Sequence, residues 1–285
     1  MGVEPTRASS APPHTGFEDR GRHRTTTTPT RILQHPTPPS SWWYNGPVSA
    51  VVRPYVPGDR EAVFRIAADT AYFGDPVEQF LPDRQFLLDV FVSYYLDCEP
   101  DHTWVADVDG EVAGYLTGST GGAAAAAGQL RTGLRASARL MVGRYRLGAV
   151  GRGHLRCTVL AKVRGEYPSV DERAYPAHLH VNLAPAARGL SLGRRLVEAC
   201  LGQMAQLGVP GLHLNTTNLN AAAVRLYEKM GFELLARSRT RLWEPHMPGV
   251  EVFHLAYGRR ITEADLSYVS AWAPAPADGT LGGAT

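Results

Sequence analysis

Residues 180–193 read "HVNLAPAARGLSLG", and this stretch decides the fold. Alternating apolar residues lead through a proline into a short turn with glycine, after which an amphipathic helical pattern begins. A strand that feeds a helix through such a turn presents backbone N–H groups to an anion. Ser191 stands where phosphate loops often carry glycine. The stretch therefore predicts a strand–turn–helix unit whose turn is a candidate phosphate site.

The charges beside this turn support that interpretation. Arg194 and Arg195 fall in the first turn of the predicted helix, where the helix dipole disfavours cations. Together with Arg188 they form a basic cluster that is better explained if an anion binds there. The alternative is that Gly189 and Gly193 serve only the chain geometry and that the arginines are solvated.

The composition limits the class of protein. The 285 residues carry 29 basic and 27 acidic side chains, a net charge of +2, so nucleic acid is not an expected partner. Cys98, Cys157 and Cys200 are widely spaced and form no CxxC, which fits neither a disulfide framework nor a zinc site, and we expect no metal. No apolar run suits a membrane span or a secretory signal. We therefore expect a soluble, cytoplasmic protein without membrane contact.

The chain divides into parts by composition. Residues 1–46 and 271–285, rich in small and polar residues and proline, are expected to be a disordered leader and tail. Residues 47–270 are expected to form one domain. A helical insertion is expected within it at 119–170.

Hydrophobic periodicity predicts an α/β fold with the order β-α-α-β-β-insertion-β-α-β-α-β-β. Asp59 is a possible N-cap of the first helix, and Asp109-Gly110 suits a hairpin turn. Gly231 ends the last helix. In the helix after the turn, the predicted buried stripe is Leu192, Leu196, Cys200, Met204 and Leu207. The expected strands are 50–56, the two strands of the hairpin within 102–118, 177–183, 211–217, 232–244 and 250–260, and the expected helices 59–73, 83–97, about 191–207 and 220–230.

Two motifs resemble those of the GNAT superfamily of acyl-coenzyme A N-acyltransferases. The first runs from Arg188 to Gly193 and is preceded by an apolar Leu183 two residues before a proline. It departs from the family pattern at Ser191, where the family has glycine. The second, "NAAAVRLYEKMGF" at 220–232, matches N-x-x-A-x-x-L-Y-x-x-x-G-F at each fixed position. The form "AHLHVNLAP" looks most like the subgroup related to acetyltransferase-like domains of O-GlcNAc hydrolases.

The resemblance covers about 50–258 and implies a mixed, mostly antiparallel sheet flanked by helices, with acetyl-coenzyme A as co-substrate. It implies that backbone N–H groups of 189–194 hold the pyrophosphate and that the Leu183 N–H stabilises the thioester oxyanion. The strands on either side would splay to admit the pantetheine arm. The implied cofactor-binding residues are Leu183, Arg188, Gly189, Leu190, Ser191, Leu192, Gly193, Arg194 and Asn220.

The resemblance also proposes catalytic residues. Tyr227 would donate a proton to the departing thiolate. Without the surrounding motif, a core aromatic would be the better interpretation of this residue. His178 and His180 share one strand face with Asn182, and their ordinary pKa near 6.5 suits a general base. Structural histidines or a water relay are the alternatives, and a β-bulge would reverse which face meets the substrate.

Two features have no firm assignment. Asp75 and Glu78 are weaker candidates for binding an amine. Nine basic residues between Arg131 and Arg164 occur without an acidic one, and Leu130, Leu134, Ala138 and Met141 recur at helical spacing. This segment could be a solvated face, a lid over the coenzyme or an acidic acceptor, or a polyanion or membrane contact.

Together with the arginines near the start of the helix, the resemblance implies an N-acetyltransferase in which a primary amine attacks the thioester directly. The acceptor, a small molecule or a peptide, and the oligomeric state are not predicted. The alternative is a non-catalytic module that keeps the fold and binds acyl-coenzyme A.

Overall fold

The computed structural model describes residues 49–271. The predicted leader and tail fall almost wholly outside this range. Within the described residues, one sheet of seven strands has the order β1-β2-β3-β4-β5-β7-β6, and all neighbours are antiparallel except β4 and β5, which are parallel. The strands are β1 (Ala50–Pro54), β2 (Thr103–Val108), β3 (Glu111–Ser119), β4 (Ala177–Leu183), β5 (Gly211–Thr217), β6 (Glu233–Thr240) and β7 (Val252–Arg260).

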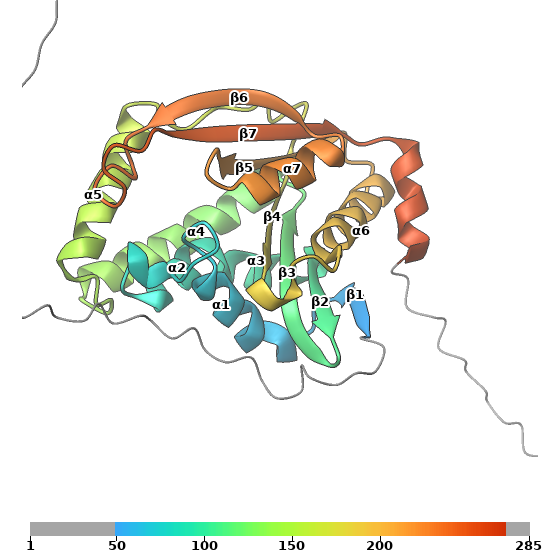
Figure 1. Cartoon of the computed structure of the whole chain (residues 1–285), viewed down its shortest axis with the longest axis horizontal. Coiled ribbons are helices and arrows are strands. Elements are labelled where there is room, and N and C mark those ends of the chain that lie inside the picture. Colours follow the sequence, from blue (N-terminus) through green and yellow to red (C-terminus); the bar gives the residue numbers. More distant parts are fainter. Residues whose placement is uncertain (1–48, 272–285) are drawn as a thin grey trace, which may run out of the picture. The chain divides into compact units, whose positions relative to one another are not determined.

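Helices lie on both sides of this sheet (Figure 1). The α-helices are α1 (Arg60–Asp69), α2 (Arg84–Phe91), α3 (Ser93–Cys98), α4 (Gly122–Met141), α5 (Gly148–Val163), α6 (Leu192–Gln206) and α7 (Ala221–Lys229). The short 3-10 helices are η2 (Pro57–Asp59), η3 (Val77–Gln79), η4 (Pro100–His102), η5 (Pro185–Ala187) and η6 (Glu263–Ala271). This mixed sheet flanked by helices is the predicted GNAT fold.

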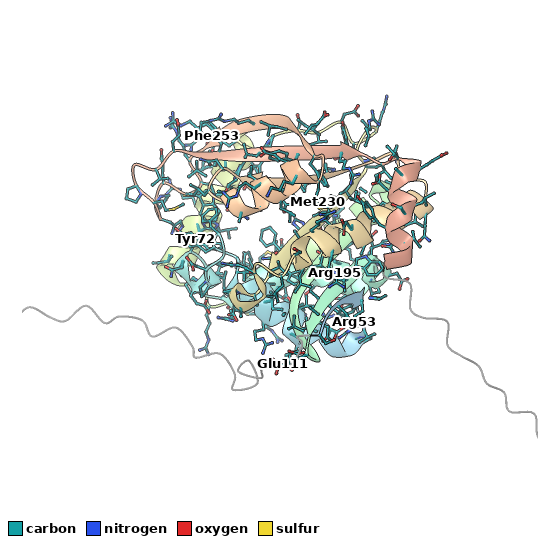
Figure 2. The ribbon with its side chains drawn as sticks, turned by 45° about the vertical axis from the view of Figure 1, so that its right-hand side comes forward. Arg53, Tyr72, Glu111, Arg195, Met230 and Phe253 are labelled. Carbon is teal, nitrogen blue, oxygen red and sulfur yellow. The ribbon has the colours of Figure 1, made fainter. Side chains whose placement is uncertain are left out.

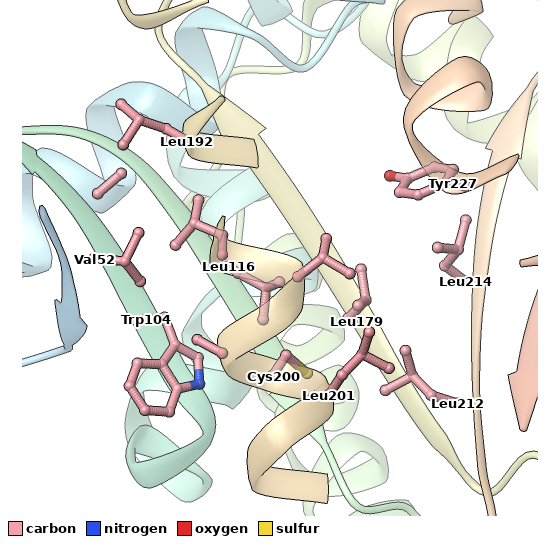
Figure 3. Close-up of a cluster of buried hydrophobic side chains, with 14 of the residues drawn as sticks. Val52, Trp104, Leu116, Leu179, Leu192, Cys200, Leu201, Leu212, Leu214 and Tyr227 are labelled. Atoms are coloured by element: carbon pink, nitrogen blue, oxygen red, sulfur yellow. The ribbon is translucent and has the colours of Figure 1, made fainter. Parts of the chain in front are cut away.

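Strand alternation divides the core between the two faces of the sheet. Trp104, Leu116 and Leu179 pack with α6 on one face, where the α6 residues Leu196 and Cys200 are fully buried (Figure 3). The opposite face packs against α1, α2 and α3 through a second cluster. That cluster contains Val63, Ile66, Ala67, Leu88, Val92, Leu96, Val105 and Tyr115.

The predicted turn and helix end are confirmed in detail. Asp109 and Gly110 both have positive φ, as a two-residue hairpin requires. At the end of α7, the Phe232 N–H donates to the Tyr227 carbonyl and the Gly231 N–H to the Glu228 carbonyl. This pair of bonds is a Schellman motif, and Gly231 takes its left-handed position.

The first two predicted helices need correction. Asp59 does not cap α1, because its carboxylate accepts hydrogen bonds from Arg53 and from the Val56 N–H instead. That helix ends at Asp69 rather than at 73. The second predicted helix is divided at Val92, where φ is −120°, into α2 and α3. Asp83 does cap α2 through a hydrogen bond from the Phe86 N–H.

Hydrophobic periodicity did not predict the last described element, η6. The 3-10 helix η6 packs against α6, where the absence of a side chain at Gly202 admits Tyr268 and Val269. The Asp265 carboxylate anchors it by accepting hydrogen bonds from Arg259 and the Thr262 N–H. Leu207, predicted to be buried, is 53% exposed because it lies just past the end of α6.

Candidate functional site

The parallel strands β4 and β5 separate after a short contact. They pair only at Ala177 with Leu212 and at His178 with His213, although β4 continues to Leu183. Beyond that contact β5 pairs only with β7. A gap therefore opens between the carboxyl ends of β4 and β5, as the family resemblance implied for the pantetheine arm.

The ladder between β3 and β4 fixes which backbone groups face this gap. The Ala184 N–H donates to the Ala113 carbonyl, so this pair is a hydrogen-bonded one and Leu183 with Gly114 is not. The N–H groups of Leu183 and Val181 therefore point away from β3, toward the gap. The sequence predicted the role of the Leu183 N–H but not that of the Val181 N–H. That the Val181 N–H points the same way follows only from the strand register.

The loop after β4 and the start of α6 present a row of free donors. Gly189 and Ser191 both have positive φ, +87° and +57°. The first helical hydrogen bond runs from the Arg195 N–H to the Ser191 carbonyl. Within residues 49–271, the N–H groups of residues 189–194 donate to no other residue. Six consecutive donors at a helix N-terminus suit an anion with several oxygens, such as a pyrophosphate.

Ser191 does not act as the favoured N-cap that its residue type suggests. Its backbone is left-handed, and its side chain makes no capping hydrogen bond. A left-handed conformation costs a non-glycine residue about 1 to 2 kcal/mol. The serine thus occupies a backbone position that favours the glycine of the family pattern.

The three arginines around the loop all contact the protein. Arg188 donates to the Gly74 carbonyl at 3.3 Å, and Arg194 forms an ion pair with Glu198 at 2.8 Å. Arg195 donates to the Ala50 carbonyl at 2.6 Å, and Figure 2 shows it beside β1. Arg188 and Arg194 are largely exposed, so their charge still acts on an anion at the loop.

Two candidates from the second motif lie in α7. The Asn220 side chain caps α7 by accepting a hydrogen bond from the Ala223 N–H at 3.4 Å. Tyr227 is buried next to Phe232, Tyr257 and Leu214 (Figure 3). Burial raises the pKa of its phenol, so it is protonated at neutral pH.

The candidate bases are joined by a residue that sequence reasoning missed. The Tyr95 hydroxyl of α3 lies 2.7 Å from Nε2 of His178 and 3.1 Å from Nε2 of His180. The strand β4 pairs with β3 without a bulge, so both histidines face the helices. The Asn182 side chain, on the same face, donates to the Thr70 hydroxyl. Nothing in the sequence pattern marks Tyr95, because the contact joins α3 to β4.

The placement of Gln129 selects one hydrogen-bond pattern for this cluster. A hydroxyl carries a single proton, so Tyr95 donates to one histidine and accepts from the other. In the orientation that the structure gives Gln129, its amide nitrogen lies 3.4 Å from Nε2 of His178 and donates to it, which is consistent with Nε2 of His178 as the acceptor. His180 then donates its Nε2 proton to Tyr95, and its Nδ1 carries the free lone pair.

Burial changes the acidity of these histidines. Burial, followed by the nearby rings of His180 and His213, lowers the pKa of His178 to about 3. Burial, followed by the nearby ring of His213, also lowers the pKa of His180, although this residue keeps an opening to solvent. Both imidazoles are neutral at pH 7, and both are weaker bases than the ordinary value indicated.

A cavity of about 780 Å³ lies over the point where β4 and β5 diverge. Polar side chains from several elements line it, together with small residues at the start of α4. Neither Leu183 nor Tyr227 lines the cavity. The cavity therefore lies near the paired ends of β4 and β5 and not at the open end of the gap. The polar lining residues are Tyr94, Tyr95, Gln129, Thr132, Lys162, Glu172, Arg173, His178, His180, His213 and Asn215.

Asp75 and Glu78, the weaker candidates for binding an amine, do not line this cavity. Glu78 forms an ion pair with Arg84, and Asp75 holds a turn by a backbone bridge to Tyr72. In the part of the chain that the structure describes, no group of three His, Cys, Asp or Glu side chains could hold a metal ion. No helix between residues 49 and 271 is long and apolar enough to cross a membrane.

Comparison with known proteins agrees with this geometry. Residues 152–232 match the model of the "Acetyltransferase (GNAT) family". The match spans β4, the loop, α6, β5 and α7, which are the elements that form the gap and the row of donors. The GNAT resemblance is therefore supported for this region.

Solved structures with similar folds cover most of the chain. The crystal structure of SsHAT has 26% sequence identity to this chain and a TM-score of 0.49, and the alignment covers 75% of this chain and 100% of SsHAT. A polyamine N-acetyltransferase of Drosophila melanogaster is 17% identical, with 74% and 100% covered and a TM-score of 0.47. The yncA protein of Salmonella typhimurium, solved with its cofactor acetyl-CoA, is 16% identical, with 75% and 95% covered and a TM-score of 0.45.

Proposed function

We propose that this protein is an N-acetyltransferase that uses acetyl-coenzyme A and a primary amine. The observation that carries the proposal is the row of free N–H donors at 189–194 beside the gap between β4 and β5. A pyrophosphate at the start of α6 and an extended arm in the gap need these two features together. Residues 189–191 and 194 of this row are exposed, whereas Leu192 and Gly193 are buried.

The residues that would hold the coenzyme are the implied set. The N–H groups of 189–194 bind the pyrophosphate, and Arg188 and Arg194 add positive charge. The Leu183 N–H, and the Val181 N–H that points the same way, are placed to stabilise negative charge on a thioester oxygen. Asn220 holds the start of α7 rather than the coenzyme in this structure, and we propose that its contribution is to position Tyr227.

The proton transfers fall to residues on opposite sides of the gap. Tyr227, protonated and buried at the α7 side, donates to the sulfur that leaves as a thiolate. His180, with a free Nδ1 and an open side chain, accepts the proton of the amine, either directly or through water. Tyr95 and His178 hold the tautomer of His180 through its other nitrogen.

The cavity over His178 and His180 is proposed as the place where the acceptor amine enters. It lies on the sheet face opposite α6, so amine and coenzyme would approach the gap from different sides. Direct attack of the amine on the thioester then requires no covalent enzyme intermediate. We propose that the acceptor is a small molecule or a peptide. Two further proposals come from the sequence alone: membership of the subgroup related to O-GlcNAc hydrolases, and a cytoplasmic location.

Two observations favour a second candidate function, a binding module without catalysis. The lowered pKa of His178 and His180 weakens both candidate bases, and Ser191 departs from the family pattern. Such a module would bind acetyl-coenzyme A but release no thiol.

Two measurements on the purified chain test these functions. Calorimetry with acetyl-coenzyme A is expected to show binding, and the absence of any affinity would exclude both candidates. A thiol-release assay with a panel of amines, peptides and aminoglycosides is expected to show turnover with at least one acceptor. Coenzyme binding without acceptor-dependent thiol release would favour the binding module.

A further inference from the structure

The helix α4 turns three of its four large apolar residues away from the protein, and the fourth, Leu140, is partly buried. Leu130, Leu134 and Met141 are 65%, 61% and 82% exposed. They recur at i, i+4 and i+11 and so lie on one side of the helix, and we call this row the outer stripe of α4. The sequence pattern had identified these residues as a stripe but not the direction in which it points.

The opposite side of α4 explains this orientation. It packs against the protein through small residues, since Ala125, Gly128 and Ala136 are buried. A side chain at Gly128 would come within 2.6 Å of the Tyr94 ring. Near Gly128 the backbone of α4 therefore lies too close to α3 for large residues to face inward. Leu140, near the end of α4, is the exception and packs against an apolar cluster of the protein.

Unpaired cations border the outer stripe. Arg131 and Arg135 lie beside it, and together with Leu130 and Leu134 they line a shallow groove on α4. Of the nine basic residues in 131–164, only Arg139 and Arg164 pair with an acidic residue of the described chain. The other seven are Arg131, Arg135, Arg144, Arg146, Arg152, Arg156 and Lys162.

We infer that the outer stripe of α4 docks on an anionic lipid surface. A helix with aliphatic and Met side chains on one side and arginines beside them lies in the plane of a membrane, with the apolar side inserted and the cations at the headgroups. The α4 helix has 20 residues, a length of about 30 Å at 1.5 Å per residue, which is typical of such helices. Val142, directly after α4, is 72% exposed and extends the apolar surface.

Other occupants fit less well. A second copy would bring two surfaces of unpaired positive charge together. The leader before residue 49 has five arginines and three acidic residues, so it is also basic. Nucleic acid would pair with the arginines but leave the aliphatic stripe in water. Side chains that protrude this far insert into a bilayer without a matching pocket, which an acidic protein partner would have to supply.

This inference revises the expectation, based on the lack of a long apolar run, that the protein makes no membrane contact. The overall charge of +2 hides a segment of nine cations and no acid. Binding through α4 needs no spanning helix, because such helices lie on the membrane rather than cross it. The surface is independent of the proposed acetyltransferase function.

Flotation of the full chain with lipid vesicles, without coenzyme, tests this inference. Vesicles of phosphatidylcholine with about a quarter phosphatidylserine are expected to bind the chain, and vesicles of phosphatidylcholine alone much less. The double variant Leu134→Ser/Met141→Ser is expected to bind at least about tenfold more weakly, because the inserted apolar area is lost. The double variant Arg131→Gln/Arg135→Gln is expected to lose about fivefold per arginine.

Matched controls separate this surface from general effects. Leu207→Ser removes another exposed leucine and Arg65→Gln another exposed arginine, and both are expected to bind like the unmodified chain. All of the substituted side chains are exposed, so folding is expected to be retained. No vesicle binding, or binding unaffected by the two α4 variants, would overturn the inference. A dimer that dissociates in Leu134→Ser/Met141→Ser, or duplex DNA binding that the variant retains, would likewise overturn it.

Discussion

The helices α6 and α4 use similar residues in opposite ways. In α6, large apolar residues such as Leu196 and Met204 face the sheet and are fully buried. In α4, alanines and glycine face the protein, and Leu134 and Met141 face outward. Both helices carry arginines, but those near the start of α6 contact protein groups, whereas most in the α4–α5 segment have no acidic partner among the described residues.

The difference shows what helical periodicity can determine. A period of 3.6 residues identifies which side chains share a side of a helix. Which side meets the protein depends on the space available: α6 lies on an open sheet face, while α4 lies directly against the Tyr94 ring. The following predictions, in order of expected effect, test whether α6 serves binding and whether α4 is held by a few polar contacts.

The largest effect is expected at the start of α6 from Gly193→Glu. Gly193 is buried, and a side chain there would lie 3.3 Å from Leu183 and Leu226. A carboxylate beside the free N–H groups would occupy the anion position and repel a pyrophosphate. Like-charge contacts cost several kcal/mol, so affinity for acetyl-coenzyme A measured by calorimetry is expected to fall at least about 100-fold.

Gly193→Ala is the matched control, because it introduces the same close contact without the charge. It is expected to bind more tightly than Gly193→Glu, and circular dichroism would verify that both variants are folded. Equal affinity of Gly193→Glu and the unmodified chain would show that the start of α6 is not the binding site.

The next largest effect is expected from Tyr227→Phe. If Tyr227 donates the proton to the thiolate, its removal lowers kcat by about 100-fold or more while coenzyme affinity remains nearly unchanged. Turnover by thiol release and affinity by calorimetry separate the two quantities. An unchanged kcat would mean that Tyr227 is only a core aromatic of the cluster with Phe232 and Tyr257.

The sequence predicted the α6 region well because several local signals coincide there. Strand alternation fixed β4 over 177–183, and the glycine at 231 ended α7 as expected. The gap between β4 and β5 came from the family resemblance, since strand separation has no local signal. The backbone conformation of Ser191 contradicted its residue type, because a serine is the usual N-cap and here it is left-handed.

Features built from distant segments could not be predicted. The hydroxyl of Tyr95 meets His178 and His180 across more than 80 residues of sequence. The depressed pKa of His178 follows from that packing, so the ordinary value used for the sequence was too high. The outward direction of the α4 stripe depends likewise on the contact of Gly128 with Tyr94.

A moderate effect is expected where α4 is attached. The buried Asp89 of α2 accepts hydrogen bonds from Gln85, from the Tyr145 hydroxyl at 2.6 Å and from Arg139 of α4. Asp89→Asn replaces an acceptor oxygen with a donor that faces these donors. The free energy of unfolding in urea is expected to fall by about 2 kcal/mol. Asp97→Asn is the control, because Asp97 forms an exposed ion pair with Arg60. It is expected to change the free energy of unfolding by less than about 1 kcal/mol.

The Asp89 effect has a defined pH dependence. Burial alone raises the pKa of Asp89, but hydrogen bonds from Tyr145, Gln85 and Arg139 outweigh it and the pKa is lowered. The contribution to stability is therefore complete above the unfolded pKa of about 3.9 and is lost as the pH falls through the lower folded value. The difference between Asp89→Asn and the unmodified chain is expected to shrink below about pH 4, and a difference that stays constant down to pH 2 would refute this assignment.

The smallest effect is expected from Ser191→Gly, which tests the one irregular residue of the loop. The φ of +57° is unfavourable for serine and free for glycine, so the free energy of unfolding is expected to rise by about 1 kcal/mol. Ser191→Ala keeps the backbone cost and is expected to give no such gain. Because the proposed contact with the coenzyme is through backbone N–H groups, affinity in Ser191→Gly is expected to be equal or higher. A large loss of affinity in both variants would instead identify the serine hydroxyl as a ligand of the anion.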